Sequence, residues 1–126
     1  MTRRATGHVA FEEGPEKVSD VVKNALALLG ISFVGENVSG NGQRVVEIWG
    51  RRGLSLWSWG EIVDVRVSSN ERGESLVEAI SECVWPLQIF DNGTNRKNLE
   101  SFFAALKMQL RIVGPVHVEE KRWGSE

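Results

Sequence analysis

The residues of this sequence with the most chemical potential are three tryptophans and one glutamate. Trp57, Trp59 and Glu61 are two residues apart, so on an uninterrupted strand they share one face, and the same alternation adds Val63, Val65 and Val67 to it. Trp49 falls on the preceding predicted strand, from which we expect it to pair with this row across the turn. Such a row is typical of a core, because aromatic cross-strand pairs stabilise sheets. The alternatives are the floor of a site for an apolar ligand or a protein partner and, less favoured, a platform for stacked nucleic-acid bases.

Glu61 would place a carboxylate within an apolar row, where an unpaired charge is costly. One hypothesis pairs it with Arg96 at the start of the last predicted helix, with Arg51 or Arg52 as the second choice. The other hypothesis makes Gly60 a bulge that turns Glu61 to solvent. An enzyme that uses Glu61 is the least favoured reading, because no second acid, base or nucleophile has the spacing of a known motif. We therefore assign no catalytic residue.

The polar segment from Asp91 to Asn98 precedes and opens the last predicted helix. Its composition is typical of turn and helix-cap chemistry. Free backbone N–H groups at a helix start can also hold an anion, to which Arg96 and Lys97 would add positive charge. The anion site is the minor alternative.

Metal, cofactor and nucleophile motifs are missing from the sequence. His8 and His117 are near opposite ends of the chain and have no second ligand at zinc-like spacing, so we expect no metal site. The single cysteine, Cys83, excludes an intrachain disulfide and is typical of a reducing, cytoplasmic setting. Phosphate-loop, dinucleotide and serine-hydrolase motifs are also missing, so no cofactor is expected.

Two amphipathic helices and a series of strands must position these residues. The first helix is predicted from Pro15 to Leu29, with Gly30 ending it. The second runs from Thr94 or Asn95 through Leu110 to Val113 and is stopped by Gly114 and Pro115. The expected strands are 7–12, 31–38, 43–50, 54–68 and 74–85, and a short extra strand at 116–118 is an option.

These elements predict an α+β fold with the order β-α-β-β-β-β-α, in which two helices cover one face of an antiparallel meander. The expected core is drawn from both helices and the sheet: Val18, Val22, Leu26 or Leu29, Phe33, Val65, Leu99, Phe102, Phe103 and Leu106. The order resembles the TATA-binding-protein-like and helix-grip architectures. The stretches Ser58-Trp59-Gly60-Glu61 and Phe90 to Arg96 also resemble small bacterial domains of unknown function that carry S-W-G-E and F-D-x-G-x-N-R. That resemblance covers roughly residues 45–107 and implies no activity.

Composition sets the outer limits of the function. The 126 residues carry a formal charge of −2 and fit one domain, 1–126, with residues 1–5 and 119–126 expected to be loose. Near-neutral charge argues against nucleic acid as a partner, and no apolar run is long enough to cross a membrane. We therefore expect a small non-enzymatic domain that binds an apolar small molecule or a protein partner between the sheet and the last helix. The alternative is a self-associating homodimer rather than a monomer.

Overall fold

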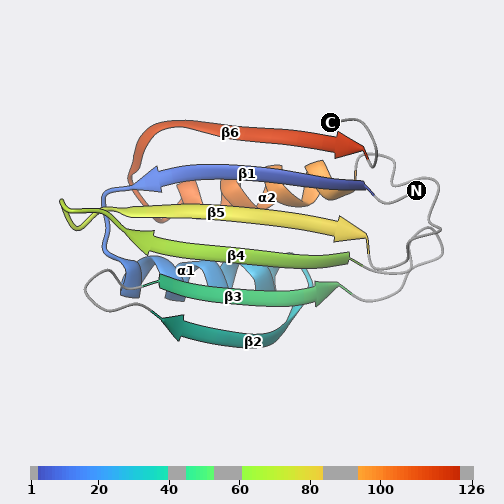
Figure 1. Ribbon diagram of the computed structural model, residues 1–126, viewed down its shortest axis with the longest axis horizontal. Coiled ribbons are helices and arrows are strands. Elements are labelled where there is room, and N and C mark those ends of the chain that lie inside the picture. The colour runs from blue at the N-terminus through green and yellow to red at the C-terminus, as the bar shows by residue number, and fades with distance from the viewer. Residues whose placement is uncertain (1–2, 40–44, 53–60, 84–93, 123–126) are drawn as a thin grey trace.

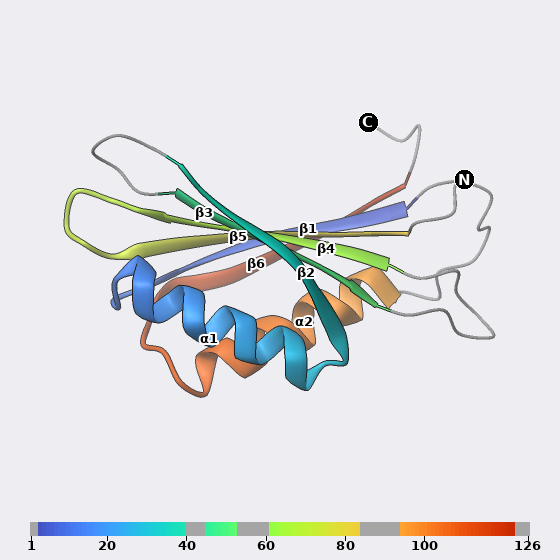
Figure 2. The ribbon, with the colours of Figure 1, turned by 90° about the horizontal axis from the view of Figure 1, so that it is seen from below.

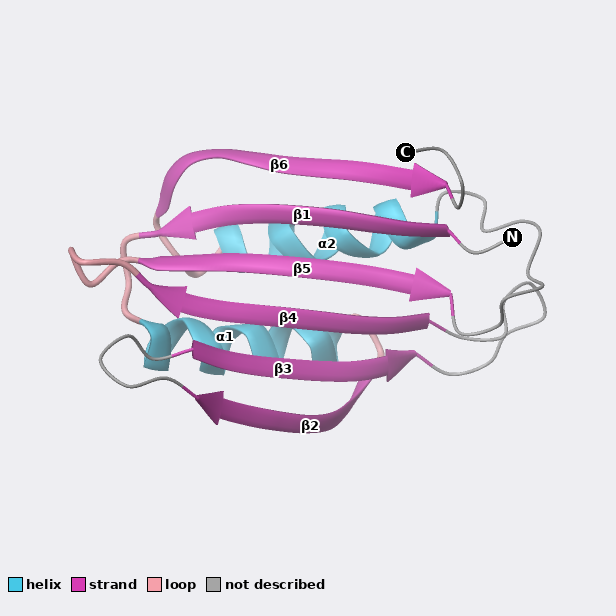
Figure 3. Cartoon of the chain, viewed as in Figure 1, coloured by secondary structure: helices cyan, strands magenta, loops and turns pink. Residues whose placement is uncertain are grey.

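A computed structural model describes residues 3–39, 45–52, 61–83 and 94–122. The elements follow one another as six strands and two helices (Figure 1): β1 (Arg3–Phe11), α1 (Pro15–Leu28), β2 (Ile31–Ser39), β3 (Val45–Arg52), β4 (Glu61–Ser69), β5 (Ser75–Cys83), α2 (Thr94–Lys107) and β6 (Ile112–Arg122). The described helices are too short to cross a membrane. Figure 3 shows that the helices lie behind a continuous sheet.

All six strands form one sheet in the order β2-β3-β4-β5-β1-β6, and each neighbouring pair is antiparallel. The chain therefore leaves β1, crosses under the sheet through α1 and re-enters at the far edge as β2. Both helices pack on the same face (Figure 2), which confirms the predicted α+β class and its two layers.

The core fills the layer between helices and sheet. The helix stripes supply Val18, Val22 and Leu26 from α1, and α2 adds aromatic bulk, all with at most 1% of their surface exposed. The predicted core members are confirmed, and of the alternatives Leu26 and Leu29 it is Leu26 that is buried, while Leu29 packs against the core and is partly buried. The side chain of Phe33 lies outside the described part of the molecule. The α2 and sheet members that complete this layer are Leu99, Phe102, Phe103, Leu106, Ile48, Val63, Val65, Val67 and Val77.

The ends of α1 follow the local sequence. Pro15 occupies the first turn, where its missing N–H would have no intrahelical partner. Gly30 adopts a φ of 75°, a left-handed conformation that ends helices and that glycine adopts without a steric penalty. Both residues were predicted in these roles.

The end of α2 corrects the prediction. The helix ends at Lys107 rather than at Gly114 and Pro115, and the chain turns back to form β6 from Ile112. Leu110 keeps the helical period but is buried beyond the helix, whereas the β-branched Ile112 and Val113 favour a strand. Gly114, with a φ of 84°, and Pro115 form an irregularity inside β6.

The chain ends correct a second expectation. Residues 3–5 belong to β1 and residues 119–122 to β6, and residues 3–6 pair in register with residues 119–122. Residues 1–2 and 123–126 lie outside the described part of the chain. Charged residues such as Glu119 are compatible with an edge strand because their side chains reach water. Charge alone was therefore a poor sign of a loose tail.

Candidate functional site

No described helix or strand covers the face of the sheet opposite the helices (Figure 2). Strand β4 shows how the two faces separate, because Val63 and Val65 are fully buried while Ile62 and Arg66 are exposed. We call this second surface the uncovered face. Its central rows come from five strands and contain Glu47, Trp49, Asp64, Arg66, Glu78, Ile80, Thr6, His8, His117 and Glu119.

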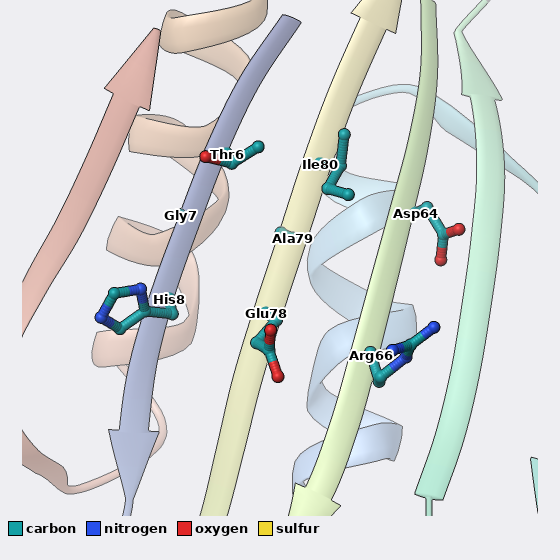
Figure 4. A pocket seen from close by; sticks show the side chains of 8 residues that line it. All are labelled: Thr6, Gly7, His8, Asp64, Arg66, Glu78, Ala79 and Ile80. Atoms are coloured by element: carbon teal, nitrogen blue, oxygen red, sulfur yellow. The ribbon is translucent and has the colours of Figure 1, made fainter. Parts of the chain in front are cut away.

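A hollow of about 270 Å³ lies at the middle of the uncovered face (Figure 4). Gly7 and Ala79 form its base with their backbone, because Ala79 directs its side chain to the helix-covered face and a Cβ on Gly7 would point there too. Polar groups and one aliphatic side chain surround this base: Thr6, His8, Asp64, Arg66, Glu78 and Ile80. We call it the central hollow. It is lined by both an apolar surface and charged groups.

Asp64 is the most unusual group in the central hollow. Partial burial of its carboxyl raises the pKa of Asp64, and the nearby Glu47 carboxylate raises it further, against an opposing effect of Arg66. Arg66 directs a guanidinium nitrogen to Glu47 at 3.2 Å instead. Among the described side chains, none makes a hydrogen bond or ion pair with Asp64, and Arg66 acts on it only through its charge.

Trp49 lies beside Asp64, which corrects its predicted place. The two residues are direct cross-strand partners on β3 and β4, so Trp49 belongs to the uncovered face and not to the row of Val63 and Val65. Its indole ring rests on Gly35 of β2, where an added Cβ would lie 2.5 Å from the ring. The ring thus forms a half-buried wall next to the central hollow.

The other predicted site residues are placed only in part. Trp57 and Trp59 lie outside the described residues. Glu61 opens β4 opposite Arg52 of β3 and Cys83 of β5, and its side chain is outside the description. The expected bulge at Gly60 is likewise in the part of the chain left undescribed.

Arg96 lies near the start of α2 and makes an ion pair within the helix. Its Nε is 2.7 Å from Oε1 of Glu100, one turn later, and about half of each side chain is exposed. The hypothesis that Arg96 pairs with Glu61 stays a prediction. The partner identified for Arg96 is a local one that the spacing of four residues could have indicated.

The space between the sheet and α2, where a ligand was expected, is filled by the side chains that the structure describes. Phe102 and Phe103 have their ring centroids 5.5 Å apart and are almost completely buried. Asn98 donates a buried hydrogen bond to Ser81 of β5 at 3.3 Å, which fixes the start of the helix on the sheet. The uncovered face is consequently the better candidate for binding.

Sequence reasoning missed the central hollow, although part of its pattern was visible. Val63, Val65 and Val67 were expected on one face of a strand, and the same alternation places Asp64 and Arg66 on the other. The partners from β1 and β5 could not be found in this way, because their register depends on the assembled sheet.

Comparisons with known proteins give a fold and no family. No family model and no curated protein matches the chain. The chain is similar to the crystal structure of an adenosylmethionine decarboxylase from Aquifex aeolicus VF5, with a TM-score of 0.53 and 6% sequence identity over 96% of this chain and 88% of that one. A second similar structure is that of Ara h 8.0201, with a TM-score of 0.49 and 9% identity over 86% of this chain and 97% of that one. At such low identity the first likeness shows a shared fold alone.

Proposed function

We propose that this chain is a non-catalytic binding domain whose uncovered face binds a small organic amine, with the ammonium group held by Asp64. The observation that carries the proposal is the half-buried Asp64 carboxylate, which has no hydrogen bond or ion pair with any described side chain. A carboxylate shielded from water gains most from a nearby cation. This refines the predicted apolar ligand to an apolar body that bears a positive charge.

The balance of charge around the central hollow supports a cation. Glu47 is paired with Arg66 at 3.2 Å, and Glu82 is paired with Arg4 at 3.4 Å. Asp64 and Glu78 are left without a compensating ion pair among the described residues. The hollow therefore favours ligands with positive charge.

Apolar surface next to Asp64 supports the rest of the ligand. Ile80 is 37% exposed on the rim of the hollow. The Trp49 indole lies on the other side of Asp64, and tryptophan is the side chain that best attracts an ammonium group through its ring face. The volume of about 270 Å³ is close to the lower limit of ordinary ligand sites, so a small amine fits better than a large molecule.

Charge disfavours the homodimer in which two uncovered faces meet. Such a dimer would bring the uncompensated carboxylates of both copies into one low-dielectric interface, where like charges repel. The exposed Ile62 and Leu76 would gain from that contact, but they flank the acidic centre. Light scattering with sizing chromatography tests this directly, and a concentration-dependent dimer that Ile80→Glu dissociates would replace the amine proposal with self-association.

Titration with phenethylamine and its neutral analogue phenethyl alcohol tests the proposal. We expect amide resonances of β4, β5 and β1 to shift with the amine and not with the alcohol. Asp64→Asn should weaken amine binding at least tenfold, whereas the matched control Glu100→Gln, a carboxylate on α2, should leave it unchanged. Equal effects of amine and alcohol, or equal binding by Asp64→Asn, would contradict the role of Asp64.

A further inference from the structure

The two histidines of this chain, which are near its opposite ends in sequence, lie side by side in the sheet. His8 of β1 and His117 of β6 are direct cross-strand partners. Their ring centroids are 5.1 Å apart and the ring planes are tilted by 33°. Figure 4 shows the ring of His8 on the β6 side of β1, away from Asp64 and Arg66.

This ring separation is the one that two imidazoles need to hold one metal ion. With metal–nitrogen distances of about 2.0–2.1 Å and a tetrahedral angle, the centroids of two coordinating rings are roughly 5 Å apart. His8 and His117 therefore have to rotate about their side-chain bonds but do not have to move their backbones. Both side chains are exposed, so a hydrated ion can reach them.

An irregularity in β6 stands directly beside this pair. His8 pairs with His117, whereas Ala10 pairs with Val113, so three residues of β6 face one residue of β1. Gly114 in this segment has a φ of 84°, which allows the strand to bend. Bulges commonly redirect side chains next to binding sites, and this one sets the position from which His117 approaches His8.

Carboxylates surround the histidine pair. Oε1 of Glu119 lies 3.9 Å from Nε2 of His117 on the same strand. Glu78 is the cross-strand partner of His8 on its other side. The described residues contain no group of three or more histidine, cysteine or acidic side chains placed to hold one metal ion. The two imidazoles are therefore the only ligands already in place among these residues, and water or a rotated Glu119 would complete the coordination of the ion.

We propose that His8 and His117 form a two-imidazole site for a divalent transition-metal ion such as Ni²⁺, Cu²⁺ or Zn²⁺. Imidazole nitrogen suits these ions, whereas Mg²⁺ and Ca²⁺ prefer oxygen ligands. The adjacent acidic side chains add attraction for a cation. The site shares the uncovered face with the proposed amine site but uses different ligands, so either can exist without the other.

Calorimetric titration of the protein without an affinity tag tests the site, with NiCl₂ and ZnCl₂ as the probes. We expect one ion per chain, no binding of MgCl₂ and a rise in the thermal midpoint with added Ni²⁺. His8→Ala and His117→Ala should each weaken Ni²⁺ binding at least tenfold. Because the chain has no other histidine, each single variant keeps one imidazole and the double variant keeps none.

Two controls separate coordination from folding and from the thiol. Cys83→Ser should bind Ni²⁺ as the parent protein does, and so should Glu100→Gln. Far-ultraviolet circular dichroism checks that the histidine variants are folded, and His117→Gln serves as a second variant that keeps a polar side chain in place. Unchanged Ni²⁺ affinity in the His8→Ala, His117→Ala double variant would overturn the proposal, as would loss of binding in Cys83→Ser.

Discussion

On the helix-covered side of β4, Val63, Val65 and Val67 are fully buried, whereas the alternate residues Ile62, Asp64 and Arg66 face away from the helices. One strand of nine residues thus serves two surfaces with different physical demands. The covered face excludes water and requires close packing. The uncovered face tolerates charge and leaves Asp64 without a partner among the described side chains. The comparison teaches that stability and recognition can be separated experimentally in this molecule, since alternate residues on one strand belong to different surfaces.

The largest expected effect is on the covered face. Phe103→Ala should lower the free energy of unfolding by about 3–5 kcal/mol, because it removes a fully buried ring and leaves a cavity. Urea denaturation measures the change. A loss below about 1 kcal/mol would mean that α2 does not pack on the sheet as described.

The same substitution on both faces sharpens the comparison. Gly7→Ala would place a Cβ 2.6 Å from the Phe103 ring and 2.8 Å from the backbone oxygen of His117, so we expect a cost of about 1–3 kcal/mol. Gly35→Ala meets the Trp49 ring, which is half-buried on the uncovered face and can rotate away. It should therefore cost clearly less in the same urea titration. Equal losses would show that the uncovered face is packed as tightly as the covered one.

Asp64→Asn should stabilise the folded protein at neutral pH, whereas the substitutions above destabilise it. Burial raises the pKa of Asp64 in the folded protein, so the folded state holds this proton to higher pH than the unfolded chain does. As the pH rises from the ordinary pKa of an aspartate through the raised pKa of Asp64, the free energy of unfolding of the parent therefore falls relative to that of the variant. At pH 7 we expect the variant to be more stable by up to about 0.5 kcal/mol, and at pH 3 the two should be nearly equal. Thermal denaturation at both pH values measures this, and a variant that is less stable at pH 7 would assign Asp64 a structural role.

The smallest effect concerns the exposed end of α2. Arg96→Met and Glu100→Gln should each have little effect, with a coupling of about 0.3–0.5 kcal/mol between them. A double-mutant cycle of Arg96 with Glu61 should be additive if the local ion pair is the dominant one. Coupling well above 1 kcal/mol in that second cycle would instead support the pair that the sequence suggested.

The helices and most strands could be predicted from the sequence because their signals are local. The stripe from Val18 to Leu26 and the residues at both ends of α1 define that helix without reference to the rest of the chain. Strand β6 could not be predicted in full, because Leu110 and Val113 continue the helical period of α2. Tertiary packing decides where α2 ends, since Leu110 is buried although it lies beyond the last helical residue.

The site was less predictable because it depends on register. Trp49 was assigned to the wrong face, since a shift of one residue between β3 and β4 moves every side chain to the other side. His8 and His117 were dismissed as metal ligands because ligand spacing along the chain was the criterion. Their contact exists only through the pairing of the first and last strands, which no local pattern encodes.

The pairing of β1 with β6 also affects when the protein can fold during synthesis. Strand β1 is synthesised before the other described strands, whereas its two neighbours in the sheet, β5 and β6, are the last of them. The nascent chain must therefore keep β1 from pairing elsewhere until β5 and β6 have been synthesised. Because Arg3 and Arg122 are paired, a short linker could join these two strand ends, and a circular permutant opened between β4 and β5 at residues 70–73 would place β5, β6 and β1 one after another along the chain. In such a permutant the β1–β6 pairing becomes local, whereas the β4–β5 pairing, a hairpin in the parent, becomes the most distant one. Its folding rate relative to the parent therefore measures which of these two pairings limits folding.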